Sequence, residues 1–394
     1  MHDGDGWGCA GMDRRTFLKA GLCGATSALV GRSAIADAAQ YYASSEPFVF
    51  PAPVYRTLGR TGLKITVVSF GAGGTPDTEV MKVAFDHGVN FVDTGRSYVK
   101  GKGEEIVGKA LKGRRDKVYL ATKTLNVSKS KEDIIKDVEA SLKALETDYI
   151  DIILLHMLAD KERIFIPETR EALVRLKEQG KVRFFGVSTH KNQPEVLDAL
   201  VEDRDRFFDV AMVAYNFNSG KEVKEAIARV AKTNIGIIAM KTQAGGYETD
   251  ALLPASPHQA ALKWVLQDPN ITAAIPHMRT LSQLKEDISV MGMPFKSADE
   301  RILRRYGSAI RPYYCRICGK CEATCPRGVE IGTINRALMY AEGYGDRELA
   351  LSTYREIPSS TSVSACQDCP RCVARCVNDL NISAKMERAR KLLA

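Results

Sequence analysis

Between residues 54 and 296 the chain repeats one pattern eight times, a short β-rich run followed by an amphipathic helical run. The run Ile150–Leu155 is apolar at nearly every position, which is typical of a strand buried on both faces of a parallel sheet. Eight such units in about 240 residues predict an α/β fold, a closed (β/α)8 TIM barrel rather than an open, doubly wound sheet. We expect the strands at Ile65–Phe70, Asn90–Asp93, Val118–Thr122, Ile150–His156, Val182–Ser188, Val210–Tyr215, Ile235–Met240 and Ile271–Ile275. We expect the helices at Thr78–His87, Glu104–Leu111, Lys131–Leu145, Pro167–Gln179, Pro194–Val201, Lys221–Lys232, Pro257–Gln267 and Leu281–Met291.

Polar side chains stand at the expected carboxyl ends of three consecutive strands. The second strand ends in Asp93, and Tyr98 follows in its loop. Lys123 comes directly after the third strand, and His156 closes the fourth. Catalytic groups of such barrels lie at this end of the strands. A single strand-end Asp or His is more often a helix cap, but four groups with complementary acid–base roles predict a catalytic site.

The four residue types suit proton transfer to or from a carbonyl oxygen. A free tyrosine has a pKa of about 10, which is high for proton exchange near neutrality. We expect Lys123 to stabilise the phenolate of Tyr98 and so to lower its pKa, with Asp93 holding the ammonium group in place. Tyr98 then acts as general acid or base, and His156 orients the carbonyl and supports the charge that develops on its oxygen.

Two segments resemble the aldo-keto reductases. Tyr55–Gly71 resembles their opening hairpin and first strand, and Phe91–Tyr98 resembles their Asp/Tyr motif. The resemblance extends over most of residues 54–293. It implies a barrel of aldo-keto reductase type, a small carbonyl or alcohol substrate, NAD(P) as cofactor, and a catalytic tetrad of Asp93, Tyr98, Lys123 and His156.

The resemblance also implies nicotinamide-binding positions, at which this sequence departs from the family. Ser188 and Thr189 lie in the stretch where the family carries a Ser-Asn pair, so Thr189 replaces the Asn. Met212 takes the place of a Gln, and Met240 that of an aromatic residue that stacks on the nicotinamide ring. Arg279 lies in the segment implied to bind the phosphates. These departures make ordinary exchange of free nicotinamide cofactor less expected than the barrel itself.

Eight of the ten cysteines lie in two runs with the same spacing, Cys-x-x-Cys-x-x-Cys-x-x-x-Cys. This is the ligand run of bacterial ferredoxins, and the first copy also has the proline that usually follows it. Zinc ribbons and disulfides also use paired cysteines, but the repeated spacing favours two four-iron four-sulfur (4Fe-4S) clusters. The residues are Cys315, Cys318, Cys321 and Cys325, then Cys366, Cys369, Cys372 and Cys376.

In two-cluster ferredoxins the fourth cysteine of each run ligates the other cluster. One predicted cluster is therefore held by Cys315, Cys318, Cys321 and Cys376, and the other by Cys325, Cys366, Cys369 and Cys372. Residues 297–394 are predicted to form a ferredoxin-like domain that follows a barrel at 54–296. Within it, Ile334–Glu342 is expected to be helical.

The N-terminal segment is predicted to be a targeting signal. Asp13–Lys19 contains Arg14 and Arg15 followed by Phe and Leu, and a modest apolar stretch ends in the small-residue site Ala34–Ala36. This resembles a twin-arginine export signal over residues 1–36, with Met12 as an alternative start, followed by a linker at 37–53. It predicts a periplasmic or otherwise extracytoplasmic protein with no transmembrane segment in its mature form.

The net charge is +8, yet no basic run interleaved with aromatic residues indicates nucleic-acid binding. Three functions remain open. The favoured one is a carbonyl–alcohol oxidoreductase whose clusters relay electrons to or from a partner protein. The alternatives are an electron-transfer protein with a barrel as scaffold, and a plain NAD(P)H-dependent reductase with structural clusters.

Overall fold

The computed structural model describes residues 48–125, 129–247, 256–367 and 369–394. The predicted export signal and the linker up to residue 47 lie outside the described residues. The elements described here belong to one compact unit, Phe50–Ala394. Within the described ranges, every helix is too short or too polar to cross a membrane.

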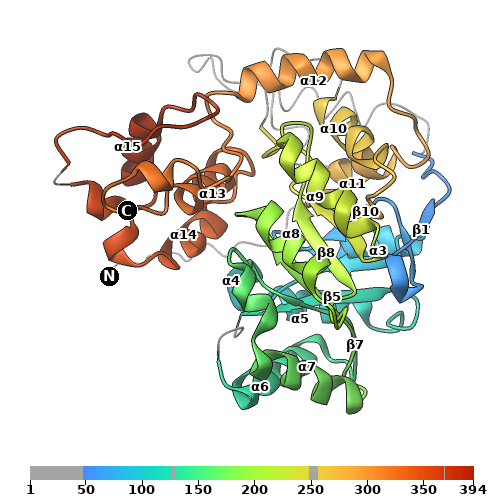
Figure 1. Ribbon diagram of the computed structural model, residues 1–394. Coiled ribbons are helices and arrows are strands. Elements are labelled where there is room, and N and C mark those ends of the chain that lie inside the picture. The colour runs from blue at the N-terminus through green and yellow to red at the C-terminus, as the bar shows by residue number, and fades with distance from the viewer. Residues whose placement is uncertain (1–47, 126–128, 248–255, 368) are drawn as a thin grey trace, which may run out of the picture. The chain divides into compact units, whose positions relative to one another are not determined.

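Eight parallel strands follow one another in chain order through a single sheet (Figure 1). Isolated bridges from Val68 to Ala274 and from Gly71 to His277 join the first strand to the last. The sheet is therefore closed, and the predicted (β/α)8 barrel is confirmed. The strands are β3 (Phe70–Gly71), β4 (Phe91–Asp93), β5 (Tyr119–Thr124), β6 (Ile150–Leu155), β7 (Val182–Thr189), β8 (Val210–Ala214), β9 (Gly236–Met240) and β10 (Ala273–Ala274).

The first expected strand, Ile65–Phe70, was wrong in its bounds. Its beginning belongs to β2 (Lys64–Thr66), which pairs antiparallel with β1 (Tyr55–Thr57), and the barrel strand β3 starts four residues later. Between the two, the Ser69 hydroxyl donates to the Thr66 carbonyl at 2.7 Å. Such local bonds compete with the hydrogen bonds of a continuous strand, and here they separate the hairpin from the barrel.

The β1–β2 hairpin closes the amino-terminal mouth of the barrel. Leu58 and Leu63 belong to the same buried apolar cluster as Ile152, which lies in β6. Arg60 forms an ion pair with Asp209, directly before β8, at 2.9 Å. Because this mouth is filled, the carboxyl ends of the strands are the end that is left for a functional site.

Helices cover the outside of the sheet, and a large apolar cluster lies between the two layers. Several helices begin at residues suited to their first turn: Ser130 accepts a hydrogen bond from the Asp133 N–H at the start of α6, and a proline occupies the first turn of α7 and of α10. Each expected helix is present, with its ends shifted by three residues or fewer. The helices are α3 (Thr78–Asp86), α5 (Gly103–Leu111), α6 (Lys131–Leu145), α7 (Pro167–Glu178), α8 (Gln193–Glu202), α9 (Lys221–Ala231), α10 (Pro257–Leu266) and α11 (Leu281–Ile288).

Helix α12 (Ser297–Ile310) lies within the predicted C-terminal domain but packs against the barrel. Its Leu303 contacts Ala260 and Ala261 of α10, and Lys263 of α10 forms an ion pair with Asp299. The remaining residues, 311–394, carry all eight clustered cysteines, and we call them the cysteine module. Its helices are α13 (Ile331–Glu342), α14 (Arg347–Arg355) and α15 (Ile382–Leu392), and α13, expected at Ile334–Glu342, begins one turn earlier.

Candidate active site

A cavity of about 690 Å³ lies at the carboxyl ends of the barrel strands. This volume is in the range of sites that hold small ligands and cofactors. Both the barrel and the cysteine module line it, so the module forms one wall of the candidate site. The barrel residues include Asp93, Tyr98, His156, His190, Met240, Lys241, His277 and Arg279. Those of the module include Arg336, Tyr340, Glu342, Tyr344, Asp346, Leu349 and Glu356.

Lys123 and Asp93 form a buried ion pair between neighbouring strands. Lys123 lies in β5, and its Nζ donates to both carboxylate oxygens of Asp93, at 2.6 and 2.7 Å. A third hydrogen bond, also 2.6 Å, goes to the Thr94 carbonyl. All three ammonium hydrogens are therefore used, which fixes the charge of Lys123 under the cavity floor.

Tyr98 and His156 stand over this pair. Tyr98 begins the short helix α4 (Tyr98–Gly101), and Lys123 Nζ lies 4.8 Å from the centre of its ring. The rings of Tyr98 and His156 meet edge to face with their centres 6.3 Å apart. Gly103 is required behind the tyrosine, because a Cβ there would lie 2.7 Å from the Tyr98 Cβ. The structure thus brings together all four members of the predicted tetrad.

The electrostatics of the tetrad differ from the expectation in one respect. Burial raises the pKa of Tyr98 well above its usual value, and the Asp93 carboxylate raises it further. The prediction that Lys123 lowers this pKa was wrong, because Asp93 compensates the ammonium charge. Burial and the charge of Lys123 lower the pKa of His156 well below its usual value. Near neutrality Tyr98 is therefore a neutral phenol and His156 a neutral imidazole.

The predicted nicotinamide contacts are divided between the cavity and the protein interior. Thr189 is fully buried, and its hydroxyl donates to the Lys191 carbonyl at 3.1 Å. The Ser188 hydroxyl accepts from the Met157 N–H at 3.0 Å, and Met212 is fully buried inside the barrel. Met240, by contrast, lines the cavity.

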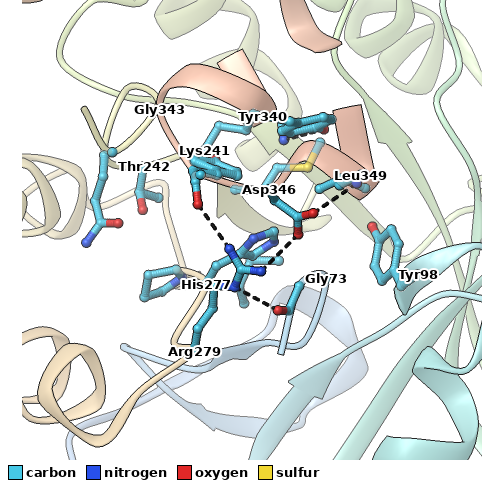
Figure 2. Close-up of a pocket in the computed structure, with 18 of the residues that line it drawn as sticks. Gly73, Tyr98, Lys241, Thr242, His277, Arg279, Tyr340, Gly343, Asp346 and Leu349 are labelled. Carbon is cyan, nitrogen blue, oxygen red and sulfur yellow. Dashed lines mark hydrogen bonds and ion pairs between the residues drawn. The ribbon is translucent and has the colours of Figure 1, made fainter. Parts of the chain in front are cut away.

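Arg279, the predicted phosphate ligand, also lines the cavity but is bound to the module. Its Nε donates to the Gly74 carbonyl at 2.9 Å and its Nη1 to the Tyr344 carbonyl at 3.0 Å. Figure 2 shows the Arg279 side chain beside Asp346. Its Nη2 forms an ion pair with Asp346 at 3.2 Å. Asp346 also accepts from the Leu349 N–H at the start of α14. The guanidinium therefore joins the barrel rim to the module.

Sequence reasoning missed several polar residues of the cavity wall. His190, Lys241 and His277 each follow the end of a strand, so the rule that located the tetrad could have found them. Arg336 and Tyr340 lie on α13 far along the chain, and no sequence signal ties them to the barrel. His190 is buried, and its Nδ1 has no hydrogen-bond partner. It is neutral, because burial lowers its pKa well below the usual value.

The eight clustered cysteines are free thiols and fall into two spatial groups. A small cavity is lined by Cys315, Cys318 and Cys321 of the first run together with Cys376 of the second. Burial raises the pKa of the Cys366 thiol, and the neighbouring thiols raise it further. These neighbours are Cys325, Cys369 and Cys372. These are the same two sets of four that the sequence pairs. In the described part of the chain, no three Cys, His, Asp or Glu side chains are placed to hold a single metal ion.

Comparison with known proteins agrees with the barrel. The Aldo/keto reductase family profile matches residues 75–253. Aldo-keto reductase YhdN of Bacillus subtilis is 34% identical over 206 residues, which are 46% of this chain and 59% of YhdN. Methylglyoxal reductase YeaE of Escherichia coli is 27% identical over 57% of this chain and 83% of its own length. The chain thus spans only a little over half of YhdN.

A solved structure resembles the same region. The aldo-keto reductase of Klebsiella pneumoniae in complex with NADPH superimposes with a TM-score of 0.54 and 26% identity, covering 64% of this chain and 95% of that protein. Together with the family profile, this confirms the aldo-keto reductase-like character of the barrel.

Proposed function

We propose that this chain, built on a barrel of aldo-keto reductase type, is an exported iron–sulfur oxidoreductase that interconverts a carbonyl and an alcohol. One observation carries the proposal: three members of the tetrad, Asp93, Tyr98 and His156, line the same cavity as the cysteine module. Groups suited to proton transfer thus face a wall formed by the part of the chain that carries the predicted electron-transfer ligands. Proton transfer and electron transfer would therefore be coupled at this cavity.

The protonation states favour Tyr98 as the proton donor in the direction of reduction. Reducing a carbonyl to an alcohol takes two electrons and one proton at the carbon, as hydride, and a second proton at the oxygen. The neutral Tyr98 phenol supplies the second proton, which its raised pKa keeps on the hydroxyl until the carbonyl oxygen takes it. Neutral His156 can donate a hydrogen bond to the same oxygen, where negative charge develops.

The ring end of the cavity suits a nicotinamide. His190 offers a buried Nδ1 without a partner, which suits the carboxamide of the ring, and Met240 provides an apolar wall. Arg279 can bind a phosphate only after it gives up Asp346 and the Tyr344 carbonyl. When bound, a nicotinamide would supply the hydride. We propose that it stays bound during turnover, because an exported protein does not meet the free NAD(P)H of the cytoplasm.

The two cysteine groups suit 4Fe-4S clusters. Each group contains three cysteines of one run and one cysteine of the other. This composition matches the exchange of the fourth ligand between the two clusters of a ferredoxin. When bound, the clusters would supply or accept electrons one at a time. Two such steps together with one proton from water balance one hydride equivalent, and a partner protein outside the barrel is the proposed source or sink of the electrons.

The group of Cys315, Cys318, Cys321 and Cys376 lies beside the barrel rim. Lys191, after β7, forms an ion pair with Glu322, the residue next to Cys321. Asn216, after β8, donates to the Tyr314 hydroxyl at 2.8 Å. We propose this group as the one that exchanges electrons with the cavity and the other as the one that meets the partner.

Export by the twin-arginine route is part of the proposal, since that route carries folded proteins and the clusters must be inserted before translocation. Replacing Arg14 and Arg15 by Lys should leave the precursor in the cytoplasm with its iron content unchanged. The measurement is immunoblotting of cell fractions together with iron analysis. Normal export of the double variant would contradict this part of the proposal.

The decisive experiment uses protein purified anaerobically. We expect about eight iron and eight sulfide per chain, bound nicotinamide, and carbonyl reduction driven by an artificial one-electron donor. Cys318→Ser should lose about half of the iron and the donor-driven reaction, while added NAD(P)H still supports reduction at the barrel. If Cys318→Ser lowered stability and both activities together, the clusters would be structural. If no carbonyl were reduced while electrons still passed through the clusters, the barrel would be a scaffold.

A further inference from the structure

We propose that Lys241 of the barrel and Arg336 of the cysteine module form a site for the carboxylate of the substrate, beside the tetrad. The substrate would then be an oxo acid or hydroxy acid rather than a neutral carbonyl compound. The inference rests on the proposed function for the identity of the reacting group. It stands on two cations of the cavity wall that lack the partners such groups normally have.

Lys241 follows β9 directly and faces the cavity. Its Nζ donates to the Tyr340 hydroxyl at 2.8 Å, and Figure 2 shows the two side chains on the same wall. Within the described residues, no carboxylate lies within ion-pair distance of Lys241. An ammonium group in a concave, largely protein-lined site without a counter-charge favours an anionic ligand.

Arg336 is the second cation. It lies on α13, lines the cavity and is only 6% exposed. Its Nη1 points at the Met157 sulfur at 2.9 Å, and its Nε is buried with no hydrogen-bond partner. Glu356 is at the limit of ion-pair distance, 4.0 Å from Nη2. A buried guanidinium normally satisfies its N–H groups, and its planar fork matches a carboxylate.

Apart from Glu356, the carboxylates of the wall have other partners, so Glu356 at 4.0 Å from Arg336 only partly balances the positive charge of this pair. Burial also raises the pKa of Asp287 well above its usual value, which favours its uncharged form. The engaged carboxylates and their partners are Asp93 with Lys123, Asp346 with Arg279, Glu342 with Lys385 and Arg388, and Glu286 with Ser256.

The two cations lie close to the reacting groups. Arg336 contacts Met157, which directly follows His156, and the charges of Arg336 and Lys241 both act on the His156 imidazole. A carboxylate bound between them would place the adjacent carbon chain toward Tyr98 and His156. Since Arg336 comes from the module, the substrate would be recognised only when the module is docked.

The test measures binding to anaerobic holoprotein by calorimetry, with pyruvate and its neutral methyl ester as probes. Wild type should bind pyruvate about tenfold or more tightly than the ester. Arg336→Met and Lys241→Met should each reduce that preference to about twofold or less. Arg304→Met on α12 and Lys221→Met on α9, both at exposed positions, should keep it. Circular dichroism and iron content check that each variant is folded.

Equal binding of pyruvate and the ester by wild type would overturn the inference. So would an unchanged preference in both variants, or a loss of NADP(H) affinity in them with pyruvate binding intact, because the cations would then serve cofactor phosphates. Inorganic phosphate serves as a third probe, and binding tighter than pyruvate would point to a phosphate ester in place of a carboxylate. Anion binding without any carbonyl turnover would contradict the proposed function and leave this site standing.

Discussion

The barrel and the cysteine module hold their candidate functional side chains on different kinds of structural element. In the barrel, Asp93 and Lys123 project from paired strands, β4 and β5, whose backbone is fixed by hydrogen bonds on both sides. In the module, the cysteines lie in turns and short 3-10 segments between helices, and thiols such as Cys321 form part of its apolar core. A core of this kind depends on what the thiols bind, since metal binding and folding are coupled in small domains.

The difference suggests a division of labour. The barrel holds the proposed proton-transfer site on rigid elements, whereas the module supplies one wall of the cavity with Arg336, Tyr340 and Asp346. The proton chemistry should therefore depend on barrel residues, and the selection of substrate and cofactor on module residues. Three sets of substitutions examine this division, from the largest expected effect to the smallest.

Tyr98→Phe should lower turnover by about three orders of magnitude, because it removes the proton donor and changes only a hydroxyl. Tyr340→Phe, the module's tyrosine in the same cavity, should lower it by about tenfold or less. Tyr55→Phe in the β1–β2 hairpin is the matched control and should have no effect. The measurement is donor-driven and NAD(P)H-driven carbonyl reduction with circular dichroism as a check on folding. Equal losses in Tyr98→Phe and Tyr340→Phe would remove the distinction between the two regions.

Asp93→Asn should lower the free energy of unfolding by about 3–5 kcal/mol, because it leaves the Lys123 ammonium buried without its counter-charge. Glu342→Gln removes the carboxylate that pairs with Lys385 and Arg388 in the module, and it should cost less because this site is more exposed. Urea titration of the anaerobic holoprotein, followed by circular dichroism, measures both. A smaller loss for Asp93→Asn than for Glu342→Gln would place the main electrostatic support in the module.

Asp346→Ala should tighten NADP(H) binding by about three- to tenfold, because it frees Nη2 of Arg279 and removes a negative charge near the expected phosphates. Glu348→Ala, two residues further along in the first turn of α14 and at an exposed position, is the matched control. Equilibrium binding measured by the quenching of protein fluorescence gives both dissociation constants. An unchanged affinity in Asp346→Ala would mean that Arg279 does not contact the cofactor.

Local patterns were sufficient for most of the barrel. Apolar runs such as Ile150–Leu155 and the proline at the start of α10 predicted strands and helices to within a few residues. The patterns failed at Ile65–Phe70. The apolar residues continue through this segment, but the Ser69 hydroxyl donates to the Thr66 carbonyl and the strand is interrupted there. Hydrophobic periodicity reports which residues are buried, and it does not report where a backbone turns.

The sequence by itself determined the closed barrel, the tetrad at the strand ends and the repeated cysteine spacing, because each depends on residues that lie close together or recur at a fixed period. Only the tertiary structure decided that Arg336 and Tyr340 of α13 reach the cavity, and that Asp346 takes a guanidinium hydrogen bond of Arg279. It also decided the protonation of Tyr98, whose pKa is raised by burial. Contacts across more than a hundred residues and the removal of water from a side chain are properties of the packed molecule, and neither leaves a local pattern in the chain.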